Sequence, residues 1–202
     1  MRKIIFYLIV LLLLNNYLFS STVIDTKDSK PPKWLQYITD YVQIRKLYPK
    51  QFPFVEFNSI GLDESEYTKD DIDILARSYI NEMKVRTLPI LNDMILLFVD
   101  ENNIYTDYSN YKKYQNKAEK YLFSVLSYFE DDNYFWVLRK DTNNKKEIVA
   151  YYLFLIDYDI LADEFKKIID KLAIDFNHRT VSKEELKIFF ADENIMNSMF
   201  KY

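Results

Sequence analysis

The chain contains a single glycine, Gly61, whereas glycine makes up roughly 7% of the residues of an average protein. Glycine supplies the positive-φ positions of tight hairpins and lets a backbone approach a phosphate closely. A chain that nearly lacks it is a poor candidate for a many-stranded barrel, a Rossmann domain or an enzyme with a phosphate-binding loop.

Cysteine is absent, and there is only one histidine, His178. Zinc sites need three or four ligands, mostly histidine and cysteine, so this composition argues against zinc. No cysteine is present for disulfides or for the acyl anchor of a lipoprotein. The nucleophile elbow of serine hydrolases, G-x-S-x-G, needs two glycines, and this chain has only one. We therefore expect no catalytic residue, no cofactor and no bound metal.

The first twenty residues have the pattern of a secretory signal peptide. The basic residues Arg2 and Lys3 precede an uninterrupted apolar run at positions 4–14. This run is shorter than the roughly 20 residues of a membrane-spanning helix. Ser20 is a small residue suited to cleavage, so we expect residues 1–20 to be removed on export to the periplasm or beyond. An uncleaved N-terminal anchor is the alternative.

Acidic residues outnumber basic ones, 31 to 27, which gives a net charge of −4. Loss of Arg2 and Lys3 with the signal peptide would leave −6. Nucleic acids and anionic membranes are bound through basic surfaces, so neither is an expected partner, and no membrane contact is expected beyond the signal segment. An acidic protein instead attracts a basic protein partner or a cation.

Hydrophobic periodicity predicts a mainly α fold, a single-domain helical bundle with one β-hairpin near residues 133–156. The second half of the hairpin has a helical alternative. The polar residues 21–31 are expected to form a flexible lead, followed by one helical domain at 32–202. The segment at 52–57 is expected to be a short extended connection between helices. Amphipathic helices are predicted at about 34–47, 68–83, 89–99, 109–129 and 161–172, with one or two short helices at the C-terminus.

Two of the predicted helices begin with a capping box, in which two side chains satisfy the free backbone N–H groups of the first turn. These are Thr68 with Asp71, and Ser182 with Glu185. Pro89 suits the first turn of another helix.

The segment DFNHRTVSKEEL at 175–186 resembles part of an EF-hand calcium loop. That loop needs oxygen ligands at positions 1, 3 and 5, glycine at position 6 and glutamate at position 12. Counted from Asp175, position 5 is Arg179 and position 12 is Leu186, and the glycine is missing. We therefore expect a capped helix junction with His178 on its surface, and no metal site.

The stretch LDESEYTKDDID at 62–73 is the densest group of charges in the chain. Acids in the first turn of a helix stabilise its dipole, which would account for part of this group without any partner. As a functional feature, the stretch would bind a basic protein. Its candidate contact residues are Asp63, Glu64, Glu66 and Asp70.

Tyrosine recurs at every third position in the middle of the chain. Tyrosine offers a large, rigid contact area with a polar tip, which suits a protein interface. The alternative is that the stripe packs on the core with its hydroxyls at the rim. The four further contact candidates are Tyr105, Tyr108, Tyr111 and Tyr114.

Together these features predict an exported, non-enzymatic protein-binding domain, of which an immunity-type or inhibitor-type protein is one form. The alternative is a cation-binding or structural envelope protein that uses the acidic stretch 62–73. A hydrolase with two carboxylates is a third hypothesis, for which the sequence singles out no pair.

Overall fold

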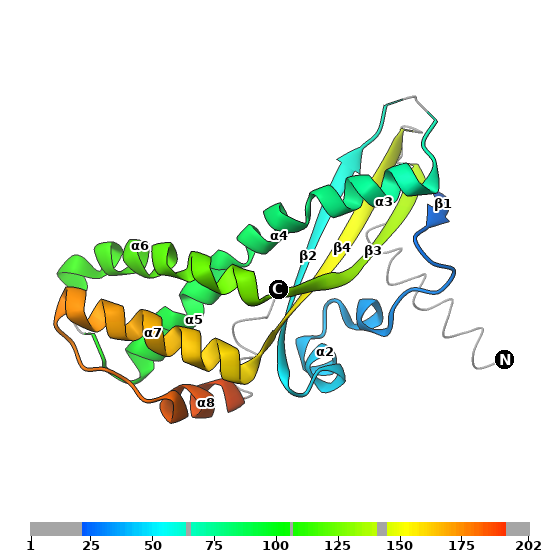
Figure 1. Ribbon diagram of the computed structural model, residues 1–202. Coiled ribbons are helices and arrows are strands. Elements are labelled where there is room, and N and C mark those ends of the chain that lie inside the picture. The colour runs from blue at the N-terminus through cyan, green and yellow to red at the C-terminus, as the bar shows by residue number, and fades with distance from the viewer. Residues whose placement is uncertain (1–21, 64–65, 106, 141–144, 193–202) are drawn as a thin grey trace.

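The computed structural model describes residues 22–63, 66–105, 107–140 and 145–192 (Figure 1). Its centre is a four-stranded antiparallel sheet with the strand order β1-β3-β4-β2. The fold is therefore α+β, and the prediction of a helical bundle with a single hairpin was wrong. The strands are β1 (Thr22–Thr26), β2 (Gln51–Gly61), β3 (Glu130–Lys140) and β4 (Lys146–Asp157).

The fold class was wrong because both edge strands were missed. Residues 22–26, expected within a flexible lead, pair with β3 as strand β1. Residues 51–61, expected to hold only a short connection, pair with β4 along their whole length as strand β2. The predicted hairpin is the β3–β4 pair in the middle of this sheet. Strand β2 contains Pro53, although proline cannot donate to a strand ladder.

The register of β2 explains how Pro53 is accommodated. Leu62 N donates to Lys146 O, and Tyr158 N donates to Lys50 O, at the two ends of the β2–β4 ladder. In an antiparallel pair the bonded positions alternate, so even-numbered residues of β2 bond to β4. Odd-numbered residues, including Pro53, turn their backbone groups toward the open edge. Pro53 therefore removes no hydrogen bond from the ladder.

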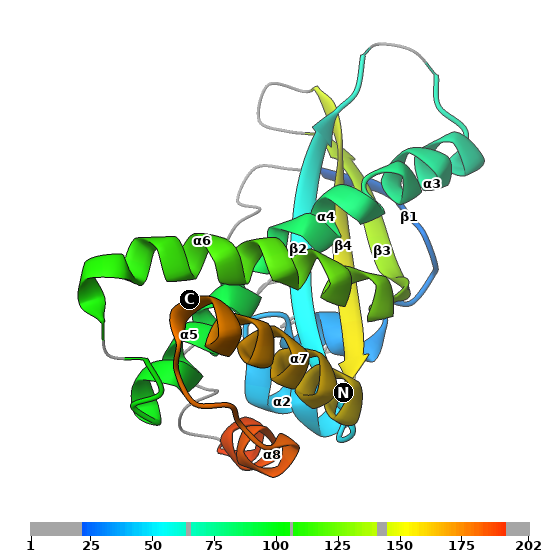
Figure 2. The same ribbon diagram turned by 60° about the vertical axis from the view of Figure 1, so that its left-hand side comes forward.

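Helices cover the two faces of the sheet unequally (Figure 2). A thin layer of η1 and α2 covers part of one face, and the other helices pack on the opposite face or beside it. Helices α5 to α8 form a bundle that extends to one side of the sheet (Figure 1). The helices are η1 (Lys33–Tyr37), α2 (Tyr41–Leu47), α3 (Lys69–Ser78), α4 (Ile80–Arg86), α5 (Leu88–Glu101), η2 (Tyr108–Asn110), α6 (Tyr111–Leu122), η3 (Phe123–Tyr128), α7 (Tyr158–Phe176) and α8 (Lys183–Ala191).

The core lies on both sides of β4. Side chains alternate between the faces of a strand, so Tyr152 and Phe154 join the main helical core while Leu153 and Leu155 join the smaller cluster under η1 and α2. All four are buried. This continuous apolar strand was compatible with either a buried strand or a buried helix when only its sequence was considered.

Several local predictions are confirmed. The capping boxes Thr68–Asp71 and Ser182–Glu185 begin α3 and α8. Pro89 lies in the first turn of α5. Within the described ranges, no helix has the length and apolar character needed to cross a membrane.

Asparagine takes the left-handed backbone positions of the described chain. Asn103 has φ 48° and Asn177 has φ 54°, whereas Gly61 does not have a positive φ. Asn177 ends helix α7, and its N–H donates to Ala173 O. Asparagine is one of the few residues other than glycine that enter this region routinely, so it closes the helix in a chain that is poor in glycine.

Replacement of Asn177 tests this role. We expect Asn177→Ala to lower the free energy of unfolding by about 1 kcal/mol, because a Cβ without a polar tip is disfavoured in the left-handed region. Asn177→Gly should keep or slightly raise stability. Urea unfolding followed by circular dichroism measures both variants. Equal stability of the two variants would contradict the assignment.

Candidate functional site

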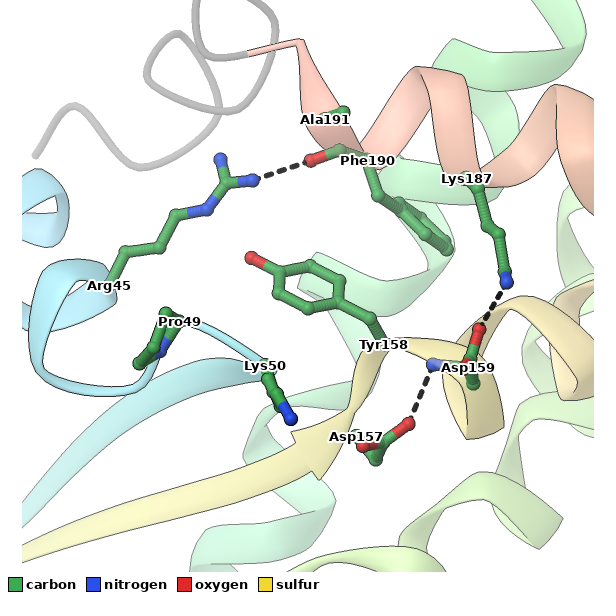
Figure 3. A pocket seen from close by; sticks show the side chains of 9 residues that line it. All are labelled: Arg45, Pro49, Lys50, Asp157, Tyr158, Asp159, Lys187, Phe190 and Ala191. Carbon is green, nitrogen blue, oxygen red and sulfur yellow. Dashed lines mark hydrogen bonds and ion pairs between the residues drawn. The ribbon is translucent and has the colours of Figure 1, made fainter.

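A shallow, open pocket of about 590 Å³ lies between α2, the start of α7 and α8 (Figure 3). Tyr158 lies in the middle of the residues drawn, with cations from three segments around it. The pocket is lined by Arg45, Pro49, Lys50, Asp157, Tyr158, Asp159, Lys187, Phe190 and Ala191.

Most charged groups of this pocket are already paired within the chain. Arg45 Nη2 donates to Phe190 O at 2.9 Å. The Asp157 carboxylate caps α7 by accepting from Asp159 N at 2.7 Å. Lys187 Nζ lies 2.5 Å from Asp159 Oδ1. Of the charged side chains that line the pocket, only Lys50 makes no hydrogen bond or ion pair with a described residue.

The two pocket carboxylates do not support a hydrolase. A glycosidase needs one carboxyl whose raised pKa keeps it protonated as a general acid. The hydrogen bond and ion pair with Lys187 instead lower the pKa of Asp159. Asp157 is occupied as a helix cap. Asp159 is therefore unsuited to the general-acid role, and the Asp157 carboxylate is engaged by the backbone of α7.

The acids of the stretch 62–73 do not converge on a common point. Among the described residues, no group of three or more histidines, cysteines or acids could hold a metal ion. Asp63 Oδ1 accepts from the Tyr67 hydroxyl at 2.9 Å, and Asp71 belongs to the capping box of α3. Glu64 lies outside the described residues.

Glu66 and Asp70 are exposed and have no hydrogen bond or ion pair with any residue that the structure describes. Glu66 lies two residues before Thr68, the N-cap of α3, and Asp70 lies in the first turn of α3, between the two capping-box residues. Both belong to the contact residues predicted from the sequence. Among the described acids of that set, they are the ones whose carboxylates are left to solvent.

The predicted tyrosine stripe divides between core and rim. Tyr114 is fully buried and Tyr105 is 6% exposed, with their rings stacked at 4.6 Å. Tyr111 is half-buried, and its hydroxyl donates to Asp100 at 3.0 Å. Tyr108 lies in η2, and its side chain is outside the described part of the chain. Tyr105 and Tyr114 therefore contribute to packing, and they are not part of the contact surface proposed below.

His178 lies at the helix junction beside this pair. Its Nε2 is 3.2 Å from the Tyr114 hydroxyl, and its Nδ1 is 2.8 Å from Arg179 O. Burial lowers the pKa of the imidazole. These contacts join the end of α7 to α6, so the histidine has a structural role in the region that resembled a metal loop.

Sequence reasoning missed a polar cluster that fastens α3 to the sheet. The carboxylate of Asp73 accepts from the Tyr134 hydroxyl at 2.8 Å and from Trp136 Nε1 at 3.1 Å. Arg77 Nε donates to Asp73 Oδ2 at 3.0 Å and to the Tyr134 hydroxyl at 2.6 Å. Lys27, just after β1, lies 3.4 Å from the centre of the Tyr134 ring.

The electrostatics of the cluster favour an ionised Asp73. Burial by itself would raise the pKa of Asp73, but the hydrogen bonds from Tyr134, Trp136 and Arg77 outweigh it and lower that pKa. Burial and the hydrogen bond to Asp73 raise the pKa of Tyr134 to about 12, so this tyrosine remains a donor. The i,i+4 spacing of Asp73 and Arg77 was visible in the sequence, but the two aromatic donors come from β3 and could not be assigned.

A second missed group is Glu56, on β2. Its even position places it on the same face as Phe52 and Phe54, opposite Tyr152 of β4. No described residue hydrogen bonds to its carboxylate. Burial raises the pKa of Glu56 to about 7, and the nearby Arg86 offsets this only in part. Arg86 itself donates to Glu82 Oε1 at 2.9 Å. A charged residue inside the apolar segment 52–57 was the sequence signal for this site.

Removal of the Asp73 carboxylate should loosen α3. We expect Asp73→Ala to lower the free energy of unfolding by about 2 kcal/mol, because the buried residues Tyr134 and Trp136 lose their shared acceptor. Asp70→Ala is the matched control on the same helix and should cost less than about 0.5 kcal/mol. Urea unfolding measures both, and similar costs for the two variants would argue against the anchor.

Glu56 should make stability depend on pH. Its folded pKa lies above the usual value of 4.5, so the folded protein binds more protons between the two values. Stability should therefore fall as the pH rises from about 4.5 to about 7. We expect Glu56→Gln to remove this slope and to add about 1 kcal/mol at pH 8. Glu119→Gln, on the exposed surface of α6, is the control. A stability difference between Glu56→Gln and the parent that is equal at pH 5 and pH 8 would refute the assignment.

Comparison with known proteins adds no functional assignment to these contacts. No protein-family model, curated protein or solved structure matches the chain.

Proposed function

We propose that the chain is an exported, non-enzymatic protein-binding domain that contacts a basic partner through the acidic segment 62–73. The observation that carries the proposal is the pair of exposed carboxylates, Glu66 and Asp70, which have no partner among the described residues. The alternative of a cation site in the same segment has less support, because the described acids do not converge.

Local contacts set the start of the helix that carries Asp70. The capping box of Thr68 and Asp71 sets the first turn of α3. One turn further on, Asp73 joins that helix to β3. A contact surface that is already ordered gives up little conformational entropy on binding. Two exposed acids beside this ordered helix start favour an electrostatic contact with a cationic surface.

The location of the segment suits a contact with another protein. It connects the end of β2 to α3, at the end of the sheet remote from the bundle of α5 to α8 (Figures 1 and 2). A partner docked there would not need to displace the helical bundle. Solvent-exposed charges in a protein–protein interface mainly accelerate association and make it sensitive to salt.

Export is part of the proposal and is consistent with the first strand. Strand β1 begins at Thr22, two residues after the predicted cleavage site at Ser20. Removal of residues 1–20 would therefore leave the whole sheet in the mature chain. One form of such a domain is an immunity-type or inhibitor-type protein, which neutralises a basic effector by covering part of its surface.

Charge reversal tests the contact surface. The tagged chain, recovered from the envelope fraction of its native host, should begin near Ser21 and should carry a basic protein that mass spectrometry identifies. With the purified pair, Glu66→Lys combined with Asp70→Lys should weaken binding at least about tenfold in calorimetry, because two attractive charges become repulsive. Affinity of the parent should also fall as salt rises.

The matched control is Glu101→Lys combined with Glu119→Lys, which makes the same change of charge on exposed positions of α5 and α6. We expect the control to alter affinity less than about threefold. If both double variants lost affinity equally, net charge alone would explain the effect, and segment 62–73 would not be part of the contact surface. A chain retained in the cytoplasm, or one that carries no protein partner, would refute the proposed function.

A further inference from the structure

Strand β2 presents an unpaired backbone edge. Its odd-numbered residues turn their N–H and C=O groups away from β4, as the register of the ladder requires. Among the described residues, the outward groups of Val55, Phe57, Ser59 and Gly61 have no hydrogen-bond partner. A free edge of this length is a template for another strand, and proteins commonly block such edges when they are not used.

The lower part of the edge is closed and the upper part is open. Phe52, Pro53 and Phe54 are buried, and the two phenylalanines belong to the main helical core. From Val55 onward the strand emerges, and the ring of Phe57 is 61% exposed. The available stretch is therefore Val55–Gly61, which offers an apolar side chain on one face and the Glu56 carboxylate on the other.

The opposite edge of the sheet does not offer the same surface. Strand β1 has only five residues, and its pairing with β3 is irregular between Val23 and Asp25. A short strand with a bulge is one of the ways in which proteins protect an edge. The β2 edge has a continuous ladder from Gln51 to Gly61 and lacks that irregularity. An added strand would therefore pair with β2 rather than with β1.

The chemistry of the edge indicates what kind of strand it receives. On an added strand, the residue opposite Glu56 would place its Cβ about 5 Å away on the same face. Glu56 has no hydrogen bond from a described residue, and Arg86 is already paired with Glu82. A lysine or arginine at that position would supply the missing cation. Its neighbours in the strand would point to the other face, where an apolar side chain would cover Phe57.

A second copy of this chain fits the edge less well. Antiparallel pairing of β2 with itself about Glu56 would place the two glutamates opposite each other, and like charges in that position are destabilising. Pairing about Phe57 would set each glutamate opposite Asn58, which leaves both carboxylates without a cation. Neither register satisfies Glu56.

We propose that an extended segment of the basic partner adds to the sheet beside Val55–Gly61, with a basic side chain on Glu56 and an apolar one on Phe57. This inference rests on the proposed function and adds a second contact to it. Main-chain hydrogen bonds to β2 would supply affinity, and the alternation of basic and apolar residues would supply specificity.

Amide hydrogen exchange tests the strand addition directly. The probe is a capped heptapeptide of alternating lysine and valine, added to the isotopically labelled chain after its export and recovery from an expression host. We expect the outward amides of Val55, Phe57, Ser59 and Gly61 to exchange at least about tenfold more slowly with the peptide bound. The amides of Asn58 and Ile60, already bonded to β4, should be slow in both states. The same peptide with glutamate in place of lysine should bind at least about tenfold more weakly.

Two variants separate the backbone and charge contributions. Ser59→Pro removes one outward N–H and, like Pro53, leaves the β4 ladder intact, so it should abolish protection while the chain remains folded. Glu56→Gln should reduce the preference for the lysine peptide over the glutamate peptide, whereas Glu119→Gln should leave it unchanged. If Ser59→Pro fails to fold, the exchange measurement on the parent chain still decides the question.

The outcomes distinguish this inference from the proposed function. In one outcome, the peptide leaves exchange at the four outward amides unchanged, while the double variant Glu66→Lys and Asp70→Lys still weakens partner binding. This outcome would overturn the edge contact alone. Protection of the amides by the lysine peptide, with no effect of that charge reversal on the partner, would overturn the role of segment 62–73 and support the edge. Protection that appears without peptide as protein concentration rises would identify a second copy as the occupant and overturn the proposal.

Discussion

Burial of strand β4 on both faces is the constraint on which the rest of the structure depends. Its alternate side chains enter two separate apolar clusters, so each face of the sheet must be covered by another layer. The thick helical layer covers one face, and η1 with α2 covers part of the other. Because β4 lies between β2 and β3, its burial also positions the open edge of β2.

Polar contacts then position the candidate contact surfaces on this apolar frame. The half-buried acceptor Asp73 joins α3 to β3, and the exposed acids Glu66 and Asp70 lie near the start of this helix. Glu56 is the opposite case, since its carboxylate lies on the helical face without a hydrogen bond from a described residue. A satisfied acid holds the structure together, whereas an unsatisfied one in a half-buried site is available to a ligand.

Much of the local structure was predictable because its causes lie within a few residues. The helices follow from three- and four-residue apolar spacing, and the start of α8 follows from Ser182 and Glu185. The acidic segment was also identified from the sequence, and two of its acids are exposed without described partners. The tyrosine stripe was harder to interpret. Tyr111 and Tyr114 belong to the same three-residue repeat, yet Tyr114 is fully buried and Tyr111 only half-buried.

The sequence by itself determined the class of chemistry that is open to this protein. With one glycine, one histidine and no cysteine, it lacks the residues for several common catalytic and metal sites. Tertiary structure alone decided that residues 22–26 and 51–61 are strands and that Tyr134 and Trp136 bind Asp73. It also decided that β2 lies at an edge of the sheet, with no described strand beyond it. The physical reason is that strand pairing and burial arise from contacts between residues far apart in the chain, which no local pattern encodes.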